Sequence, residues 1–374
     1  MDFAFTETQE DLQALARRIL EAEVTEERLR EAEAGADRFD PRTWDALAKA
    51  NLLGIALPES CGGSGYGVLE QCLVLEEIGR TVAPVPVLAS IVLGAMAIGA
   101  FGTDAQRARY AVPAATGEMI LTAALVEPGN PEPEDVQTRA TPVESGGWLL
   151  DGTKTCVPAV TLAGRVLVPA GSADGVVVAI VDPAAPGVTV IPQATTNRDR
   201  EGLLELREVR VAPDDVLAGP ADGAEVLRWI LQRATVGLCA LQLGITEKAL
   251  RMTAEYTSTR IQFDRPLAHF QAVGQRAADA FVDVEGIRLT MWQAAYRLDE
   301  GLPADTEVEV AKFWAADGGH RVAHAAAHLH GGVGVDVDYP LHRYFLWAKK
   351  VELTLGGSTQ QLLRIGRHLA AEAV

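Results

Sequence analysis

The chain has 374 residues, of which 48% are hydrophobic and 22% are charged. This length and balance indicate two or three globular domains and exclude a disordered polymer. The formal net charge of −18 argues against nucleic acid or an anionic membrane surface as a partner, because both attract basic faces, so any phosphate site must be built locally.

The first third of the chain has helical patterning. Thr6-x-x-Gln9 has the form of a capping box, and apolar residues follow it at helical spacing. A glycine-rich loop over 57–67 lacks the strand and the Lys-Ser/Thr of a nucleotide-binding loop, so we interpret it as a tight connection. Apolar helical patterning returns over 69–101, interrupted by prolines. The sequence predicts an N-terminal α-helical domain over residues 1–118.

The middle of the chain changes to strand patterning. The stretch from Trp148, with its Asp151-Gly152 turn signal, predicts a hairpin. Gly175 opens a short apolar run typical of a buried strand. Apolar residues alternate imperfectly with charged ones over 204–211, which predicts another strand. We therefore expect a middle β domain over residues 119–222.

The last third is helical again. Long periodic stretches cover 226–258, 269–299 and 308–329. They predict a C-terminal α-helical bundle domain over residues 223–374. The fold class is α+β, with the β domain lying between two helical domains in the sequence.

Cysteine usage and the N-terminus indicate a cytoplasmic protein. The four cysteines have no CxxC spacing, so neither a zinc site nor a disulfide framework is indicated, and we expect reduced, buried thiols. The first dozen residues lack the basic and apolar regions of a signal peptide. The longest apolar run, 87–102, is too short to span a membrane.

Two features allow both an ordinary and a functional interpretation. His320, His324 and His328 recur every four residues on one predicted helix face, but no carboxylate or cysteine accompanies them, so packing and polar contacts are favoured over a metal. Gly356-Gly357, followed by Ser, Thr and Gln, is compatible with an anion-binding loop and with an ordinary turn and N-cap. The stretch alone does not decide between the two.

Five stretches together carry a resemblance that covers the whole chain. They are LPESCGGSGYG (57–67), LLDGTKTCV (149–157), LLELREVRVAPDDVL (203–217), TRIQFDRPLAHFQAVGQRAAD (259–279) and HLHGGVGVDVDYPLHRYF (328–345). In this order they resemble the acyl-CoA dehydrogenases. The resemblance implies an acyl-CoA dehydrogenase fold, FAD as cofactor and α,β-dehydrogenation of a CoA thioester.

The resemblance also shows what this chain lacks. At the position of the usual catalytic glutamate stands Gly356, and at the alternative position in the first C-terminal helix stands Gln232. Neither side chain can take up a proton as a base. We therefore expect no catalytic residue in this chain.

The contacts that the family makes with the flavin ring are degenerate as well. Val126 replaces a threonine, and Cys156-Val157-Pro158 replaces a Trp-x-Thr motif. Val126 has no hydroxyl and Pro158 has no N–H, so two donors to the ring are missing.

The adenosine diphosphate half of the family's FAD site is retained. The cofactor-binding positions implied by the resemblance are Arg260, Gln262, Phe263, Gln271, His328, Gly331 and Gly332. Three positions in these motifs differ from the family's pattern. Gln262 stands where the family has threonine, Asp264 follows Phe263 where it has glycine, and His328 stands where it has glutamine. Arg260 alone could be an ordinary surface ion-pair residue, and its spacing to Phe263 and Gln271 favours the cofactor role.

This pattern of loss resembles the base-lacking β subunit of the actinobacterial α2β2 steroid-CoA dehydrogenases. The resemblance implies a homologous α subunit as partner, a steroid side-chain CoA thioester as substrate, and electron-transfer flavoprotein or a similar acceptor. A flavin-free pseudoenzyme with a structural or regulatory role is one alternative. Another is a homotetrameric flavoenzyme with a relocated base such as Glu127 or Glu352.

Overall fold

A computed structural model of the chain describes residues 4–144 and 146–372. The first third is helical, as predicted. Its elements are α1 (Glu7–Glu23), α2 (Glu26–Ala34), α3 (Pro41–Lys49), η1 (Glu59–Cys61), α4 (Val68–Thr81), η2 (Leu88–Ala95), α5 (Met96–Phe101), α6 (Asp104–Gln106), η3 (Arg107–Ala111) and α7 (Val112–Ala115).

The capping box at the start of α1 is confirmed. The Thr6 hydroxyl accepts from the N–H of Gln9 at 3.3 Å, and the Gln9 side-chain oxygen accepts from the N–H of Thr6 at 3.0 Å. These reciprocal bonds satisfy donors that a helix start leaves unpaired. Ala16 and Leu20 are buried along α1, as its apolar spacing requires.

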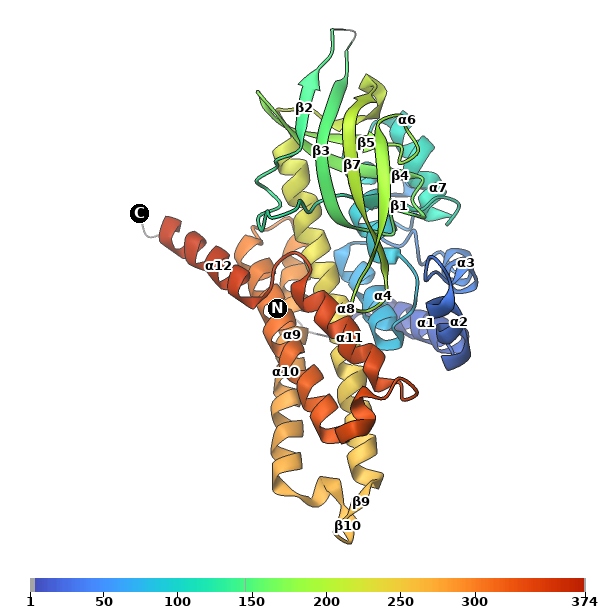
Figure 1. Cartoon of the computed structure of the whole chain (residues 1–374), viewed down its shortest axis with the longest axis vertical. Helices are drawn as coiled ribbons and strands as arrows, with labels where there is room; N and C mark the ends of the chain where they lie inside the picture. Colours follow the sequence, from blue (N-terminus) through green and yellow to red (C-terminus); the bar gives the residue numbers. More distant parts are fainter. Residues whose placement is uncertain (1–3, 145, 373–374) are drawn as a thin grey trace. The chain divides into compact units, whose positions relative to one another are not determined.

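The middle of the chain forms one eight-stranded sheet. Its strands are β1 (Leu121–Ala123), β2 (Arg139–Pro142), β3 (Trp148–Pro158), β4 (Arg165–Ser172), β5 (Gly175–Val181), β6 (Val188–Ala194), β7 (Arg200–Val211) and β8 (Val216–Ala218), with the short helix η4 (Pro213–Asp215) before β8. The order is β6-β7-β3-β2-β4-β5-β8, and β1 pairs with β4 in parallel. Figure 1 shows β2, β3 and β7 side by side.

The predicted hairpin turn at Asp151-Gly152 is wrong. Both residues lie inside β3, which pairs with β2 on one side and β7 on the other. A Cβ on Gly152 would lie 2.7 Å from the hydroxyl of Thr138, so glycine is needed here for the close approach of β3 to the segment that leads into β2. The turn between β2 and β3 instead contains Gly146 and Gly147, both with positive φ.

The imperfect alternation over 204–211 marks a β-bulge in β7. Leu150 pairs with Val209 but Gly152 pairs with Leu206, so β7 carries one residue more than β3 between these pairs. Glu208 has a positive φ of 49° at this place. The extra residue keeps the side chains on both sides of the bulge in the core, which strict alternation would not allow.

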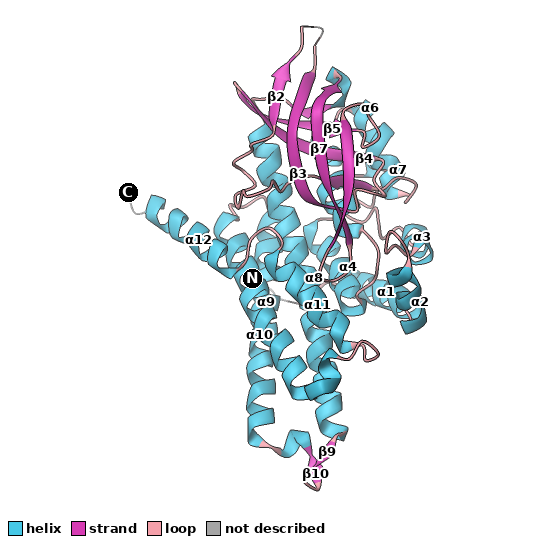
Figure 2. Ribbon diagram, viewed as in Figure 1, coloured by secondary structure: helices cyan, strands magenta, loops and turns pink. Residues whose placement is uncertain are grey.

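The last third is helical apart from one short hairpin, and the predicted long helices are confirmed. The elements are α8 (Gly223–Thr259), β9 (Ile261–Gln262), β10 (Arg265–Pro266), η5 (Leu267–His269), α9 (Gln271–Asp299), α10 (Asp305–His330), η6 (Gly331–Val335), α11 (Leu341–Leu353) and α12 (Ser358–Glu372). In Figure 2 the strands of this third are confined to the β9–β10 hairpin.

The chain divides into two compact units. The helical unit contains the described residues of Met1–Glu26, Cys72–Ala83 and Thr235–Val374, and the sheet unit contains Glu27–Gln71 and Pro84–Ala234. The core of the sheet unit is an aliphatic cluster that includes Leu150, Val168 and Leu204. The three-domain boundaries at residues 118 and 222 stay a prediction.

Within the described residues, no helix is both long and apolar enough for a membrane span. Three of the four thiols are buried as expected, but that of Cys156 is exposed.

Candidate functional site

The seven predicted cofactor-binding residues all belong to the helical unit and lie where its long helices begin or end. Arg260 directly follows the last residue of α8 and is exposed. Its N–H donates to the carbonyl of Tyr256 at 2.8 Å, and its carbonyl accepts from the N–H of Leu267 at 2.9 Å. The backbone around Arg260 is thus fixed while its guanidinium faces solvent.

Gln262 and Phe263 belong to the β9–β10 hairpin. Gln262 pairs with Arg265, and the two residues between them, Phe263 and Asp264, have φ of 53° and 63°. Two successive left-handed residues form the tight hairpin turn in which glycine is preferred and aspartate is tolerated. This explains why aspartate can replace the family's glycine here. The Phe263 side chain is 85% exposed at the tip.

Gln271 is the first residue of α9, which starts one residue after η5. The residue before it, Phe270, makes no side-chain cap hydrogen bond. The N-terminus of this 29-residue helix therefore keeps its partial positive charge and its outward N–H groups. Such an end can bind an anion.

His328 lies in the last turn of α10 and contacts Arg276, which our reading of the sequence missed. The Arg276 guanidinium lies 2.7 Å from Nδ1 of His328. Because arginine only donates, Nδ1 accepts and Nε2 carries the hydrogen. The exposed His328 therefore offers a donor through Nε2, and the pair connects the start of α9 to the end of α10.

Gly331 and Gly332 follow α10 directly. Gly331 has φ 63° and ψ −142°, a conformation that favours glycine. A Cβ on either residue would meet nothing within 4 Å, so open space lies next to this backbone. A ligand could approach it closely.

The loop that contains Gly356 is a self-contained turn. Gly356 has φ 101°. The Gln361 amide donates to the carbonyls of Leu355 and Gly356, both at 3.2 Å, and the Gln360 side chain accepts from the N–H of Gly357 at 3.0 Å. These polar side chains close the loop itself, which favours the turn and N-cap interpretation over an anion site.

A buried lysine holds the end of the helix that precedes this loop. The Lys312 ammonium is fully buried and donates to the carbonyls of Val351 and Glu352 at 3.0 and 3.1 Å, at the C-terminal end of α11. Burial lowers the Lys312 pKa to about 8. The second predicted base position, Gln232, lies within α8 in the sheet unit.

Glu127 is unsuited to be a relocated base. Its carboxylate is buried, accepts from Lys154 at 2.7 Å, and also accepts from the hydroxyl and N–H of Thr138. Burial raises the Glu127 pKa, but the bonds from Lys154 and Thr138 outweigh it, and the resulting pKa is about 2. A carboxylate this acidic has little tendency to take up a proton at neutral pH.

Glu352, the other alternative base, is also held in an ion pair. Its carboxylate lies 2.6 Å from the Lys349 ammonium and 3.2 Å from Nδ1 of His320. The His320 ring packs against that of His324, with centroids 4.2 Å apart. His320, His324 and His328, which share one face of α10, thus make polar and packing contacts. Within the part of the chain that the structure describes, no group of three or more potential metal ligands comes together.

The segment expected to face a flavin ring lies at the irregular end of β3. Cys156 has a left-handed φ of 52°, and its N–H donates to the side-chain oxygen of Gln193 at 3.0 Å. Val126 contributes only its backbone, accepting from the N–H of Thr155 at 2.9 Å. The carbonyl of Pro158 accepts from the Thr122 hydroxyl at 2.6 Å. The chain itself uses the N–H of Cys156, which leaves this segment poor in donors.

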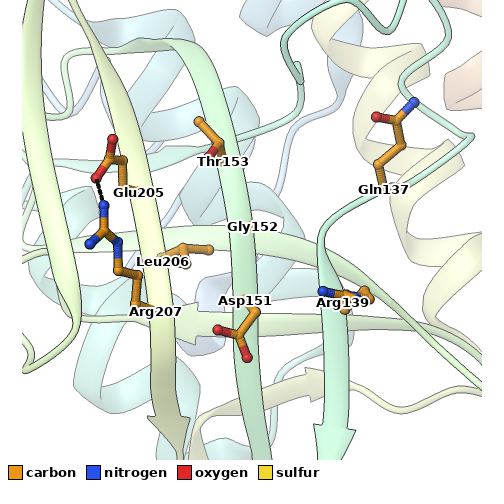
Figure 3. A pocket seen from close by; sticks show the side chains of 8 residues that line it. All are labelled: Gln137, Arg139, Asp151, Gly152, Thr153, Glu205, Leu206 and Arg207. Carbon is orange, nitrogen blue, oxygen red and sulfur yellow. Dashed lines mark hydrogen bonds and ion pairs between the residues drawn. The ribbon is translucent and has the colours of Figure 1, made fainter.

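An open groove of about 500 Å³ crosses β2, β3 and β7 in the sheet unit. Figure 3 shows its polar lining, with the ion pair between Glu205 and Arg207 drawn as a dashed line. Asp151 accepts from the N–H of Glu208 at 2.9 Å. Since both signs of charge line the groove, it has no evident preference for an anion or a cation.

Comparisons with known proteins agree on one family. Residues 6–118 match the acyl-CoA dehydrogenase N-terminal domain, and residues 221–370 match the acyl-CoA dehydrogenase C-terminal domain. Acyl-CoA dehydrogenase FadE27 from Mycobacterium tuberculosis is 46% identical, over 99% of this chain and 99% of that protein.

Two solved structures are similar over nearly the whole chain. The ChsE4-ChsE5 complex from Mycobacterium tuberculosis contains a chain with a TM-score of 0.94 and 46% identity, matched over 99% of both chains. A variant of the Tcur3481-Tcur3483 steroid ACAD contains one with a TM-score of 0.92 and 43% identity, matched over 98% of this chain and 99% of that one.

Proposed function

Since the chain belongs to the acyl-CoA dehydrogenase family, whose fold it has and whose cofactor is FAD, we propose that it is the base-lacking subunit of a heteromeric enzyme. In this role it lends the adenosine diphosphate half of an FAD site to a homologous partner subunit. When bound, FAD supplies the hydride acceptor for the α,β-dehydrogenation of a CoA thioester.

The position of Gly356 carries the proposal. It stands where the family has its catalytic glutamate, and its φ of 101° is a conformation that side-chain-bearing residues rarely adopt. The carboxylate is therefore absent at this position, and the local backbone disfavours any residue with a side chain. The alternatives Glu127 and Glu352 are held in ion pairs.

The residues of the adenosine half fit a diphosphate. Arg260 is exposed, and arginine forms paired, charge-assisted hydrogen bonds to phosphate oxygens. The uncapped start of α9 and the open backbone at Gly331 and Gly332 add N–H donors and room. His328 adds an Nε2 donor, fixed by Arg276. This cationic end is built locally on a chain whose net charge is −18.

The residues of the ring half do not fit a flavin ring. Val126 offers no hydroxyl, Pro158 offers no N–H, and the N–H of Cys156 is bonded to Gln193. A flavin whose diphosphate lies on this chain would therefore need ring contacts from the partner. That division of labour explains why one half of the site is retained and the other is lost.

The relatives support a heteromer and a steroid substrate. One similar structure is a complex of two named proteins, ChsE4 and ChsE5, and another is called a steroid ACAD with a two-part name. We extend both properties to this chain, with a steroid side-chain CoA thioester as substrate and electron-transfer flavoprotein or a similar carrier as acceptor.

Flavin content tests the proposal. The chain should be purified alone and together with the product of a neighbouring acyl-CoA dehydrogenase gene, and the flavin spectrum of each preparation recorded. We expect little or no FAD on the chain alone and about one FAD per pair of subunits in the complex. Two FAD per pair, or a yellow active homotetramer, would contradict the proposal. A colourless complex would indicate a flavin-free pseudoenzyme.

A further inference from the structure

Three rings join the ends of two long helices in the helical unit. The ring of Tyr256, in the last turns of α8, stacks on that of His330, the last residue of α10, with centroids 4.4 Å apart and planes 22° apart. Tyr339, which follows η6, contacts both rings from the side, with centroids 6.4 Å from Tyr256 and 5.3 Å from His330. We name Tyr256, His330 and Tyr339 the ring clamp.

Hydrogen bonds fix the orientation of the central ring. Nδ1 of His330 lies 2.8 Å from the carbonyl oxygen of Ala326, which can only accept, so Nδ1 carries the hydrogen. Nε2 is then an acceptor, and the hydroxyl of Tyr339 lies 3.3 Å from it and donates. His330 is only 3% exposed, and burial lowers its pKa, which favours the neutral ring that makes these two hydrogen bonds.

The ring clamp connects the two segments that would hold the diphosphate. Tyr256 accepts the N–H of Arg260 through its backbone carbonyl, so its place fixes the end of α8. His330 directly precedes Gly331, and the bond from Tyr339 ties the far end of the following loop back to the end of α10. Stacking and this bond therefore join the Arg260 segment to the Gly331–Gly332 turn, although the two are far apart in sequence.

We propose that the ring clamp positions Arg260 and the Gly331–Gly332 turn relative to each other, so that both reach one diphosphate. This inference rests on the proposed adenosine half-site and adds three positioning residues to it. A diphosphate that is bound by donors from two segments needs those segments at a fixed separation. The stacked, hydrogen-bonded clamp holds the two segments in place without touching the ligand. Tyr339→Phe should loosen the clamp while leaving the stack and the fold in place.

The test uses the heteromer with its partner subunit. We expect Tyr339→Phe to raise the FAD dissociation constant about threefold to tenfold, because one hydrogen bond of the clamp is lost and the two segments are held less firmly. The inhibition constant of ADP, which probes the adenosine half alone, should rise by the same factor. The flavin absorption spectrum should not change, and the unfolding temperature of the FAD-free protein should fall by no more than a few degrees, as expected for one lost hydrogen bond, whereas a general structural defect would alter the spectrum and lower that temperature much further. His330→Phe, which keeps the stack but removes both hydrogen bonds, should have a larger effect.

Two further variants make the result interpretable. Tyr296→Phe, on α9, removes a hydroxyl that has no hydrogen bond among the described residues, and it should leave ADP binding unchanged. Arg260→Ala tests the half-site itself. If Arg260→Ala weakens ADP binding while Tyr339→Phe and His330→Phe do not, the clamp is wrong and the half-site stands. If Arg260→Ala has no effect on ADP binding, the proposed half-site is wrong, and the role proposed for the ring clamp is then wrong as well.

Discussion

The Lys154 ammonium donates to the Glu127 carboxylate at 2.7 Å inside the sheet unit, and the two side chains are 1% and 4% exposed. Thr138 donates to the same carboxylate through its hydroxyl and its N–H. The N–H of Gln137 donates to the other carboxylate oxygen at 2.7 Å. The pair joins the segment before β2 to β3, and these hydrogen bonds add to the compensation that the two charges give each other. It therefore acts as a structural pair, although it lies next to the segment expected to face a flavin ring.

Lys154→Met should destabilise the chain by about 3–5 kcal/mol, because the change leaves Glu127 buried without its counter-charge. Denaturant unfolding at neutral pH measures the loss. Lys49→Met, on the exposed face of α3, is the matched control and should shift stability by less than about 0.5 kcal/mol. Equal stability of the two variants would show that the buried pair contributes nothing.

A second, partly buried cluster in the helical unit should make stability depend on pH. Four carboxylates face three guanidiniums there, namely Glu76, Glu77, Glu247 and Glu285 against Arg17, Arg80 and Arg288. One oxygen of Glu76 has no hydrogen-bond partner among the described residues. Burial raises the Glu76 pKa from its ordinary 4.5 to about 7.

Between pH 4.5 and about 7, Glu76 therefore holds a proton in the folded chain but has lost it in the unfolded chain. The stability from Glu76 is fully present below pH 4.5 and is lost as pH rises through about 7, with a total on the order of 3 kcal/mol. Glu76→Gln, which cannot ionise, should be more stable than the parent chain at pH 8 and equal to it near pH 4.5. Unfolding temperatures across this range measure the effect.

Glu77→Gln is the control for this prediction. Glu77 accepts two hydrogen bonds from Arg17, at 2.7 and 3.1 Å, and one from Arg80 at 3.1 Å. The loss of the Glu77 charge in Glu77→Gln should destabilise the chain at pH 8, whereas Glu76→Gln should stabilise it at the same pH. If both variants lower stability at pH 8, Glu76 is ionised and well paired in the fold, and the predicted pH dependence is wrong.

Long periodic patterns predicted the fold well, and a short local signal failed. The three predicted C-terminal helices are present because apolar residues recur at helical spacing over more than twenty residues. The Asp151-Gly152 pair was misassigned because the same two letters suit a turn and a bulged strand. The deciding contact is with Thr138, in the segment that leads into β2, and no local pattern contains it.

The spacings typical of the family pointed to Arg260, Gly331 and Gly332, which the structure places at the ends of α8 and α10, while their role in cofactor binding stays a prediction. Arg276 was missed because a single arginine on an exposed helix gives no spacing signal, and its partner His328 lies on another helix. The ring clamp was missed for the same reason, since stacking of Tyr256 on His330 exists only once α8 and α10 are packed. The left-handed conformation of Gly356 could not be read from the sequence either.

Gly356→Glu alone should not create dehydrogenase activity in this chain. The substitution places a carboxylate at the family's base position, but no flavin ring would lie opposite it. The positive φ of 101° and the Gln361 amide 3.0 Å from the position of a Cβ should also cost about 1–3 kcal/mol of stability. Gly366→Glu, on α12 where a Cβ meets nothing within 4 Å, is the control and should be neutral or slightly stabilising. Turnover by Gly356→Glu without a partner would show that a complete ring site exists here.

Arg260→Ala should weaken FAD retention by the heteromer and leave its assembly intact. Hydrogen bonds to charged groups contribute roughly 1.5–3 kcal/mol, so the FAD dissociation constant should rise about tenfold to a hundredfold. Assembly should persist because subunit contacts depend on buried apolar area rather than on one cation. Arg251→Ala is the matched control, since Arg251 is exposed on α8 and contacts only Glu255 among the described residues.

The dependence of the rate on added FAD distinguishes cofactor binding from catalysis. If the base lies on the partner subunit, saturating FAD should restore most of the rate of the Arg260→Ala heteromer, because the loss is one of occupancy and not of chemistry. The Arg251→Ala heteromer should need no added FAD. A rate that stays low at every FAD concentration, with normal flavin binding, would place Arg260 in a different role. The adenosine half-site would then lose its principal cation, and the assignment of this chain as the lender of that half would be wrong.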